Sequence, residues 1–239
     1  MQRIKQRLLL RVDRKKRVTM AAFVLTVSQH GTGQYRTVQE AIDAVPLGNT
    51  RRTVIRVSPG TYRQPLYVAK TKNFITLVGL CPEDTVLTWN NTATSIQHHK
   101  DANMIGSGTF GCGSTIVEGS DFIAENITFE NSSPQGAGQA VTLRVTADRC
   151  AFYNCSTALL EHCHIHCKSA GFITAQSKNS PQEKTGYVFL RCVVTGVTTG
   201  FRPSQRVKWA EELKNEGAEQ FRVTPSLIQN QTDLDFLKE

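Results

Sequence analysis

Residues 150–167, CAFYNCSTALLEHCHIHC, concentrate the side chains of this chain that are best suited to chemistry. They hold four of the seven cysteines and three of the six histidines. Thiolate and imidazole groups are preferred zinc ligands, which makes Cys163, His164, His166 and Cys167 a candidate ligand set. Alternate side chains of a strand, however, point to opposite faces, and this separates Cys163 from the two histidines. The four groups then share no face, and we expect no metal site.

The same segment belongs to an internal repeat. Similar six-residue patterns begin at residues 126, 149, 162 and 191. Their second positions are Ile127, Cys150, Cys163 and Cys192, and their fourth positions are Phe129, Phe152, Ile165 and Val194. Alternation places both columns on one face, which we expect to point inward, since free cysteine packs as a small apolar side chain. A chain that adds one such strand per turn, stacking like on like, is a parallel β-helix.

The spacing of this repeat is irregular. The second positions recur after 23, 13 and 29 residues. A β-helix turn needs about 20 residues or more to return above itself. The interval of 13 therefore leaves two alternatives: the register is wrong, or part of a turn is missing close to Cys155 and Ser156.

The elements around the repeat predict an all-β fold with one early helix. Residues 35–46 indicate this helix, because Thr37 and Glu40 form a capping box and Pro46 stops it. Short β-branched or aromatic runs separated by turn residues follow it. We predict strands within 53–57, 65–68, 74–79, 85–89, 114–119, 122–131, 139–145 and 186–194. No other long helical stretch occurs before residue 200, which argues against a doubly wound sheet.

Composition narrows the class of protein. The chain has 239 residues, 20% of them charged, and a net charge of +8, which suits a polyanionic partner. Most of the excess charge lies in residues 1–19, where no aromatic residue is available to stack on bases, so we expect no nucleic-acid partner. No apolar run is long enough to span a membrane, and no signal peptide is visible. An odd cysteine count makes a closed disulfide framework unexpected.

At this point the sequence resembles plant pectinesterases (pectin methylesterases), which are right-handed parallel β-helices. The resemblance covers about residues 27–197. The stretches that carry it include VSQHGTGQYRTVQEAIDAVP, GSGTFGCGSTIVEGSDFIAENITFENSS, GQAVTLRVTADRCAFYNC and STALLEHCHIHCKSAGFITAQSKN. The family hydrolyses methyl esters of galacturonate in pectin, without a cofactor.

The resemblance also implies a set of catalytic groups that this chain does not contain. In the family one Asp is the nucleophile, a second Asp is the general acid, a Gln stabilises the oxyanion and an Arg holds the nucleophile. The motifs that carry the first three, GQDTL and DFIFGN, belong between Cys155 and Ser156, where this chain has neither. The LGRPW motif with the Arg is absent near Thr199, and Arg202 of GFRPSQ does not replace it. We therefore assign no catalytic residue.

Two positions do match substrate-groove residues of the family, Thr109 and Gln139. The alternative is that they are a turn threonine and a strand-start glutamine that satisfy backbone groups. Asp121 and Asp148 are expected to be structural residues at a turn and a strand start.

These observations together predict an incomplete right-handed parallel β-helix at residues 27–200, capped by the helix at 37–45. Residues 1–26 are expected to be a disordered basic extension, and 201–239 a tail with a helix near 207–216. The resemblance implies pectin as the partner, a monomer, and a cell-wall or extracellular location. We expect an inactive esterase-family member; the alternatives are a non-catalytic pectin-binding or regulatory β-helix and, last, another β-helix enzyme such as a pectate lyase, for which no calcium-binding acidic cluster is visible.

Overall fold

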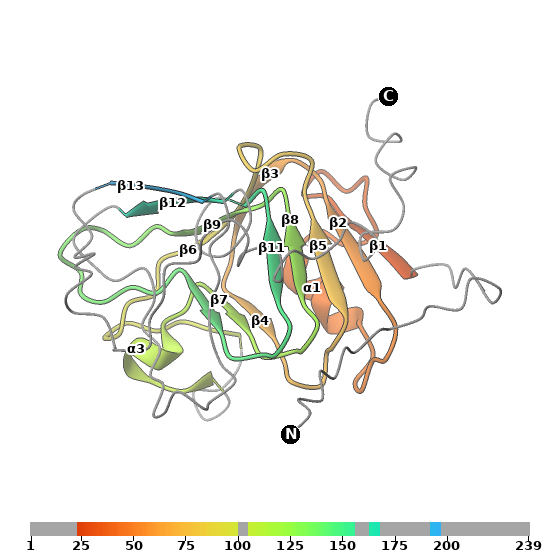
Figure 1. Ribbon diagram of the computed structural model, residues 1–239, viewed down its shortest axis with the longest axis horizontal. Coiled ribbons are helices and arrows are strands. Elements are labelled where there is room, and N and C mark those ends of the chain that lie inside the picture. The colour runs from red at the N-terminus through yellow and green to blue at the C-terminus, as the bar shows by residue number, and fades with distance from the viewer. Residues whose placement is uncertain (1–22, 100–104, 156–162, 168–191, 197–239) are drawn as a thin grey trace, which may run out of the picture.

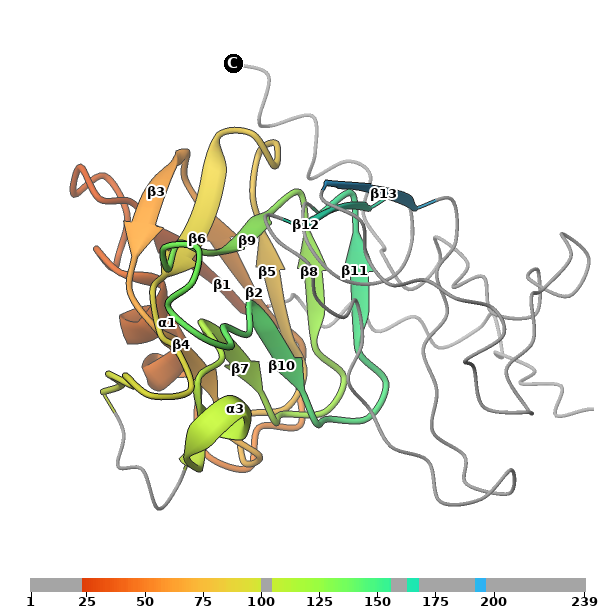
Figure 2. The ribbon, with the colours of Figure 1, turned by 90° about the vertical axis from the view of Figure 1, so that its left-hand side faces the viewer.

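The computed structural model describes residues 23–99, 105–155, 163–167 and 192–196. Most of its strands form three parallel sheets that the chain visits in turn (Figures 1 and 2). The first sheet has the order β1-β2-β5-β8-β11, the second β3-β6-β9, and the third β4-β7-β10; β12 and β13 pair separately. This arrangement is a right-handed parallel β-helix, since parallel strands are joined by right-handed crossovers. The predicted fold class is therefore confirmed.

The three coils that begin at β2, β5 and β8 each contribute one strand to each of the three sheets. The strands of the first sheet are β1 (Phe23–Val27), β2 (Thr53–Val57), β5 (Ile75–Val78), β8 (Ile123–Glu125) and β11 (Ala151–Tyr153). Those of the second are β3 (Gly60–Arg63), β6 (Thr85–Trp89) and β9 (Thr128–Asn131). Those of the third are β4 (Leu66–Val68), β7 (Thr115–Val117) and β10 (Leu143–Val145), and the separate pair is β12 (His164–Cys167) with β13 (Val193–Gly196).

The core is a set of stacked columns inside the coils. In the first sheet one column runs through five buried side chains in direct register, Leu25, Ile55, Leu77, Ala124 and Phe152. Ala124 is the smallest side chain of this column. Next to it, the Phe152 ring packs against two other aromatic rings, with its centroid 5.9 Å from those of Phe122 and Phe129. Apolar area buried in this way is the main force that holds such coils together.

Helix α1 (Val38–Ala44) closes the first coil, as the sequence predicts. Both hydrogen bonds of the expected capping box are present: Thr37 Oγ1 accepts from the Glu40 N–H, and Glu40 Oε2 accepts from the Thr37 N–H. Gln39 adds a contact that the sequence does not reveal. Its Oε1 accepts from the Tyr67 N–H at 2.9 Å and its Nε2 donates to the Tyr67 carbonyl at 3.1 Å. The side chain thus takes the place of a neighbouring strand at the edge of β4.

Several boundaries differ from the prediction; β10, for example, covers only the end of the predicted strand at 139–145. β1 pairs with β2 over its whole length, so residues 23–26 belong to the β-helix and not to a disordered extension of residues 1–26. The predicted strand at 122–131 is two strands, β8 and β9, because Asn126 adopts a positive φ of 55° and turns the chain into the next sheet. Asparagine tolerates this conformation better than most residues. β3 was also missed by the prediction.

The repeat is partly in the wrong register. The segment at 149–154 does not stack on 126–131, because β11 pairs with β8 while β9 pairs with β6. The last two segments are aligned correctly, since Ile165 pairs with Val194. The expected tail at 201–239 and its helix near 207–216 lie outside the described residues. Within the described ranges, every helix is too short or too polar to cross a membrane.

Candidate functional site

Thr109 and Gln139, the two predicted groove residues, lie side by side. Thr109 is in the short helix α3 (Gly108–Gly111), and Gln139 precedes β10. Both residues are exposed, and Thr109 Oγ1 donates a hydrogen bond to Gln139 Oε1 across 30 residues of sequence. The structure brings the pair together, and their amide and hydroxyl groups can both donate to and accept from a polar ligand.

Cys112 and Ala93 hold the backbone carbonyls of Thr109 and Gln139 in place. The thiol of Cys112 lies 3.3 Å from the Thr109 carbonyl and 3.7 Å from the Gln139 carbonyl. The Gln139 carbonyl also accepts from the Ala93 N–H at 2.8 Å. Burial raises the pKa of the Cys112 thiol, so it remains a neutral donor. The loop before β10 is thereby tied to α3 and to the segment after β6.

A cavity of about 330 Å³ adjoins the pair. Its lining residues are Ala93, Thr94, Ile96, His98, Ile105, Gly106, Ser107 and Gly108. Two of the lining residues are next to Thr109 and Gln139, which we call the groove pair. The Ala93 N–H donates to the Gln139 carbonyl, and Gly108 directly precedes Thr109. In its wall, His98 has two buried ring nitrogens, neither of which has a hydrogen-bond partner among the described residues. Burial, helped by His99 and Arg144, lowers the pKa of His98 to about 4.

Arg144 organises the interior beside the cavity. Its guanidinium donates to the carbonyls of Ile105 and Phe110 at 2.6 and 2.8 Å, and lies 4.0 Å from the Phe110 ring centroid. It also forms a 2.5 Å ion pair with Glu118. The second oxygen of Glu118 accepts from the Tyr67 hydroxyl at 2.8 Å, and burial together with this contact raises the pKa of Tyr67 to about 12. Both oxygens of the Glu118 carboxylate are thus engaged.

Sequence reasoning missed His98 and Arg144, although Arg144 carries a usable signal. It is the only charged residue in the stretch QAVTLRV, which otherwise reads as a β-strand. A guanidinium in such a strand needs a buried anion or carbonyl partners. His98 has no comparable pattern around it, because its burial depends on the cavity wall.

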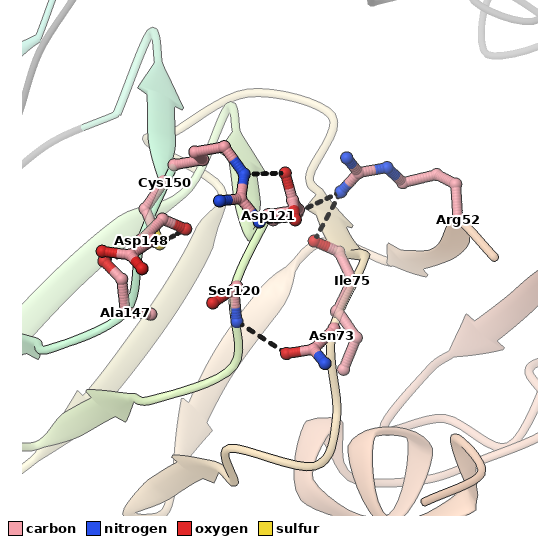
Figure 3. Close-up of polar contacts among 9 residues, drawn as sticks. Arg52, Asn73, Ile75, Ser120, Asp121, Ala147, Asp148 and Cys150 are labelled. Carbon is pink, nitrogen blue, oxygen red and sulfur yellow. Dashed lines mark hydrogen bonds and ion pairs between the residues drawn. The ribbon is translucent and has the colours of Figure 1, made fainter. Parts of the chain in front are cut away.

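Asp121 and Asp148 have backbone roles at a turn, as expected (Figure 3). Asp121 adopts a positive φ of 59°, and its carboxylate accepts from Arg149 Nε at 2.9 Å and Nη2 at 2.7 Å. These bonds lower the pKa of Asp121. Its carbonyl accepts from Arg52 Nη1, and its N–H donates to the Asp148 carbonyl at 3.0 Å. The cluster therefore fixes the turns that precede β8 and β11.

The cysteine- and histidine-rich segment follows the predicted alternation. Cys163 and Ile165 are buried, whereas His164 and His166 are exposed. Both histidine rings contact the hydroxyl of Thr195 on β13. No group of three or more His, Cys, Asp and Glu side chains among the described residues is arranged to hold a metal ion. Cys163 therefore does not share a face with His164 and His166.

Comparison with known proteins identifies the family. The family model described as Pectinesterase matches residues 24–160, more than half of the chain. The chain belongs to the pectinesterase family. Pectinesterase 31 of Arabidopsis thaliana is 63% identical over 206 residues, covering 72% of this chain and 65% of the relative. Probable pectinesterase 50 of the same species is 30% identical over 216 residues, covering 74% of this chain and 57% of the relative.

The solved structure of a pectin methylesterase from carrot agrees with this assignment. It matches with a TM-score of 0.60 at 27% identity, covering 73% of this chain and 63% of that chain. The pectinesterase chain thus spans less than two thirds of each of these relatives.

Proposed function

We propose that this chain is a catalytically defective pectinesterase, in which part of the β-helix that carries the catalytic groups of the family is missing. The family reaction is hydrolysis of galacturonate methyl esters in pectin, and the resemblance supports a place in the plant cell wall. The proposal rests mainly on one observation, the short length of the chain that connects β11 to β12.

This connection has too few residues to form a complete coil of the β-helix. The carbonyl of Cys155 accepts a 3.1 Å hydrogen bond from the His164 N–H, only nine residues later. The same kind of bond between successive coils joins Phe122 to Ala151 after 29 residues and Cys163 to Val193 after 30. Nine residues cannot supply three strands and their turns, so the strand that follows Cys155 in the ladder belongs to a later coil. The interval that looked irregular in the sequence supports a missing segment even with the register corrected.

The alignment with Pectinesterase 31 supports the same conclusion. Its 206 aligned positions include 72% of this 239-residue chain, or about 172 residues. About 34 aligned positions of the relative then have no counterpart in this chain. Coils of the first sheet measure from 22 residues, between Ile55 and Leu77, to 47, between Leu77 and Ala124, so the difference is of the length of one coil.

Two described carboxylates beside these elements, Glu118 and Asp121, are already engaged in ion pairs. Glu118, close to the groove pair, is bonded to Arg144 and Tyr67. Asp121 is held by Arg149 at a turn. Ester hydrolysis by an aspartyl mechanism needs one free carboxylate as nucleophile and a second group as acid. Neither of these side chains is free for that role.

Methanol release from methyl-esterified pectin tests the proposal. We expect the purified chain to release no methanol above a buffer blank, whereas Pectinesterase 31 in the same assay provides the positive control. Circular dichroism of the sample must show a folded β protein, so that inactivity is not a failure to fold. Turnover well above the blank would refute the proposal.

A second function, non-catalytic binding of pectin, is favoured by the groove pair and its cavity. Thr109 and Gln139 are exposed, linked to each other and fixed from behind, so they can present polar groups to a saccharide without reorganising. The net charge of +8 favours the carboxylates of de-esterified pectin.

Depletion of the chain by de-esterified pectin beads tests this binding. We expect retention that falls as salt is raised and that weakens about tenfold in Thr109→Val and Gln139→Leu, roughly the loss of one or two hydrogen bonds. Thr61→Val is the matched control, because Thr61 is an exposed β3 residue whose hydroxyl has no hydrogen bond among the described contacts. Equal retention of all three variants would place the binding elsewhere.

A further inference from the structure

We propose that His164 and His166 form a binding site for a divalent transition-metal ion, with Cu²⁺ as the tightest ligand, on the outer face of β12. The alternation that separates these side chains from Cys163 also places them together. Both are exposed, while Cys163 and Ile165 anchor the strand in the core. The site is independent of the groove pair and of ester hydrolysis.

The two rings converge on one point. Nε2 of His164 lies 2.7 Å from Oγ1 of Thr195, and Nδ1 of His166 lies 3.0 Å from the same oxygen. A hydroxyl has one proton, so it donates to only one ring and accepts from the other. Metal–imidazole bonds are about 2.0–2.1 Å long. Each ring therefore has to approach by about 1 Å or less to bind an ion at the point that the hydroxyl now marks.

The surroundings permit this exchange. Thr195 lies opposite His166 in the β12–β13 register and is itself exposed, so rotation about its χ1 angle removes the hydroxyl from between the rings. Solvent then supplies the remaining ligands as water. With two imidazoles and open positions, the site follows the general order of affinities, in which Cu²⁺ exceeds Ni²⁺ and Zn²⁺.

Calorimetric titration of the untagged full chain with Cu²⁺ tests the site. We expect one ion per chain and a loss of affinity of at least about tenfold in His164→Gln and in His166→Gln, since each removes one of two protein ligands. Thr195→Val should keep or improve the affinity, because the hydroxyl competes for the rings. His30→Gln is the matched control, an exposed histidine elsewhere on the chain that should leave the titration unchanged.

A second measurement covers variants that do not fold. Paramagnetic Cu²⁺ at substoichiometric amounts should broaden the imidazole proton signals of His164 and His166 in the unmodified chain before any other histidine signal. Selective broadening of His30, or wild-type affinity in folded His164→Gln and His166→Gln, would overturn the proposal.

Discussion

His98 lies in the wall of the cavity, and its burial makes the stability of the chain depend on pH. Its ring is largely enclosed, both nitrogens lack partners in the described part of the structure, and Arg144 adds a nearby positive charge. These conditions oppose a charge on the imidazole, which is why its pKa falls to about 4. The neutral ring packs edge-on against Tyr67, with centroids 6.2 Å apart. Folding and protonation of His98 are therefore coupled.

The free energy of unfolding should decrease on acidification because of His98. The folded pKa of about 4 lies below the ordinary value of 6.5, so the unfolded chain takes up the proton first. Stability from this residue is complete above pH 6.5 and is lost as the pH falls toward 4. We expect a loss of about 1–2 kcal/mol, reduced from about 1.4 kcal/mol per pKa unit because the ring is only partly buried.

Urea unfolding at pH 7 and pH 4.5 measures this effect. His98→Phe keeps the ring contact and removes the titration, so its loss between the two pH values should be smaller than that of the parent chain by the stated amount. His30→Gln should behave like the parent. An identical pH dependence in parent and His98→Phe would contradict the assignment.

At the scale of elements, the sequence predicted those features that depend only on neighbouring residues. The capping box of Thr37 and Glu40 and the limits of β2 and β6 could be predicted, because caps and β-branched runs act over a few residues. The strand split at Asn126 depends on one backbone torsion. The stacking partner of β11 depends on which sheet the chain has reached, and similar six-residue patterns in different sheets cannot be told apart by spacing alone. Thr109 and Gln139 were predicted as groove residues from the resemblance, and the structure shows that they lie together; the burial of His98 depends only on the packing around it.

Helix α1 should stabilise the chain mainly as a cover for the edge of β4. Gln39→Leu leaves the Tyr67 N–H and carbonyl without their present partners in a buried place, and we expect a loss of about 2–4 kcal/mol. Thr37→Ala removes only the N-cap and should cost about 1 kcal/mol. Urea unfolding of both variants gives the comparison. A loss in Gln39→Leu no larger than that in Thr37→Ala would mean that the helix acts only through its own propensity.

At the scale of the whole molecule, the short chain connection between Cys155 and His164 should affect the folding stability as well as the ester hydrolysis. Each coil of a β-helix is stabilised by the coils on both sides, so a gap in the stack weakens the columns that end at it. Cys155 and Cys163, both buried, lie on either side of the proposed gap. Burial, with Cys163 adding to it, raises the pKa of the Cys155 thiol to about 12, so this thiol carries no reactive thiolate.

Inserting the coil that we propose is missing should therefore raise stability and produce activity together. We expect a chain that carries the unmatched residues of Pectinesterase 31 between Cys155 and Ser156 and near Thr199 to melt about 10 °C or more above the parent. Three or more newly buried large apolar side chains contribute about 1.5–3 kcal/mol each, and 1 kcal/mol is about 2–4 °C at this size. The restored chain should also release methanol from pectin. A Gly/Ser insertion of equal length separates the two causes: it relieves the short connection without adding columns, so a melting temperature equal to that of the restored chain would show that strain, and not lost stacking, limits the parent.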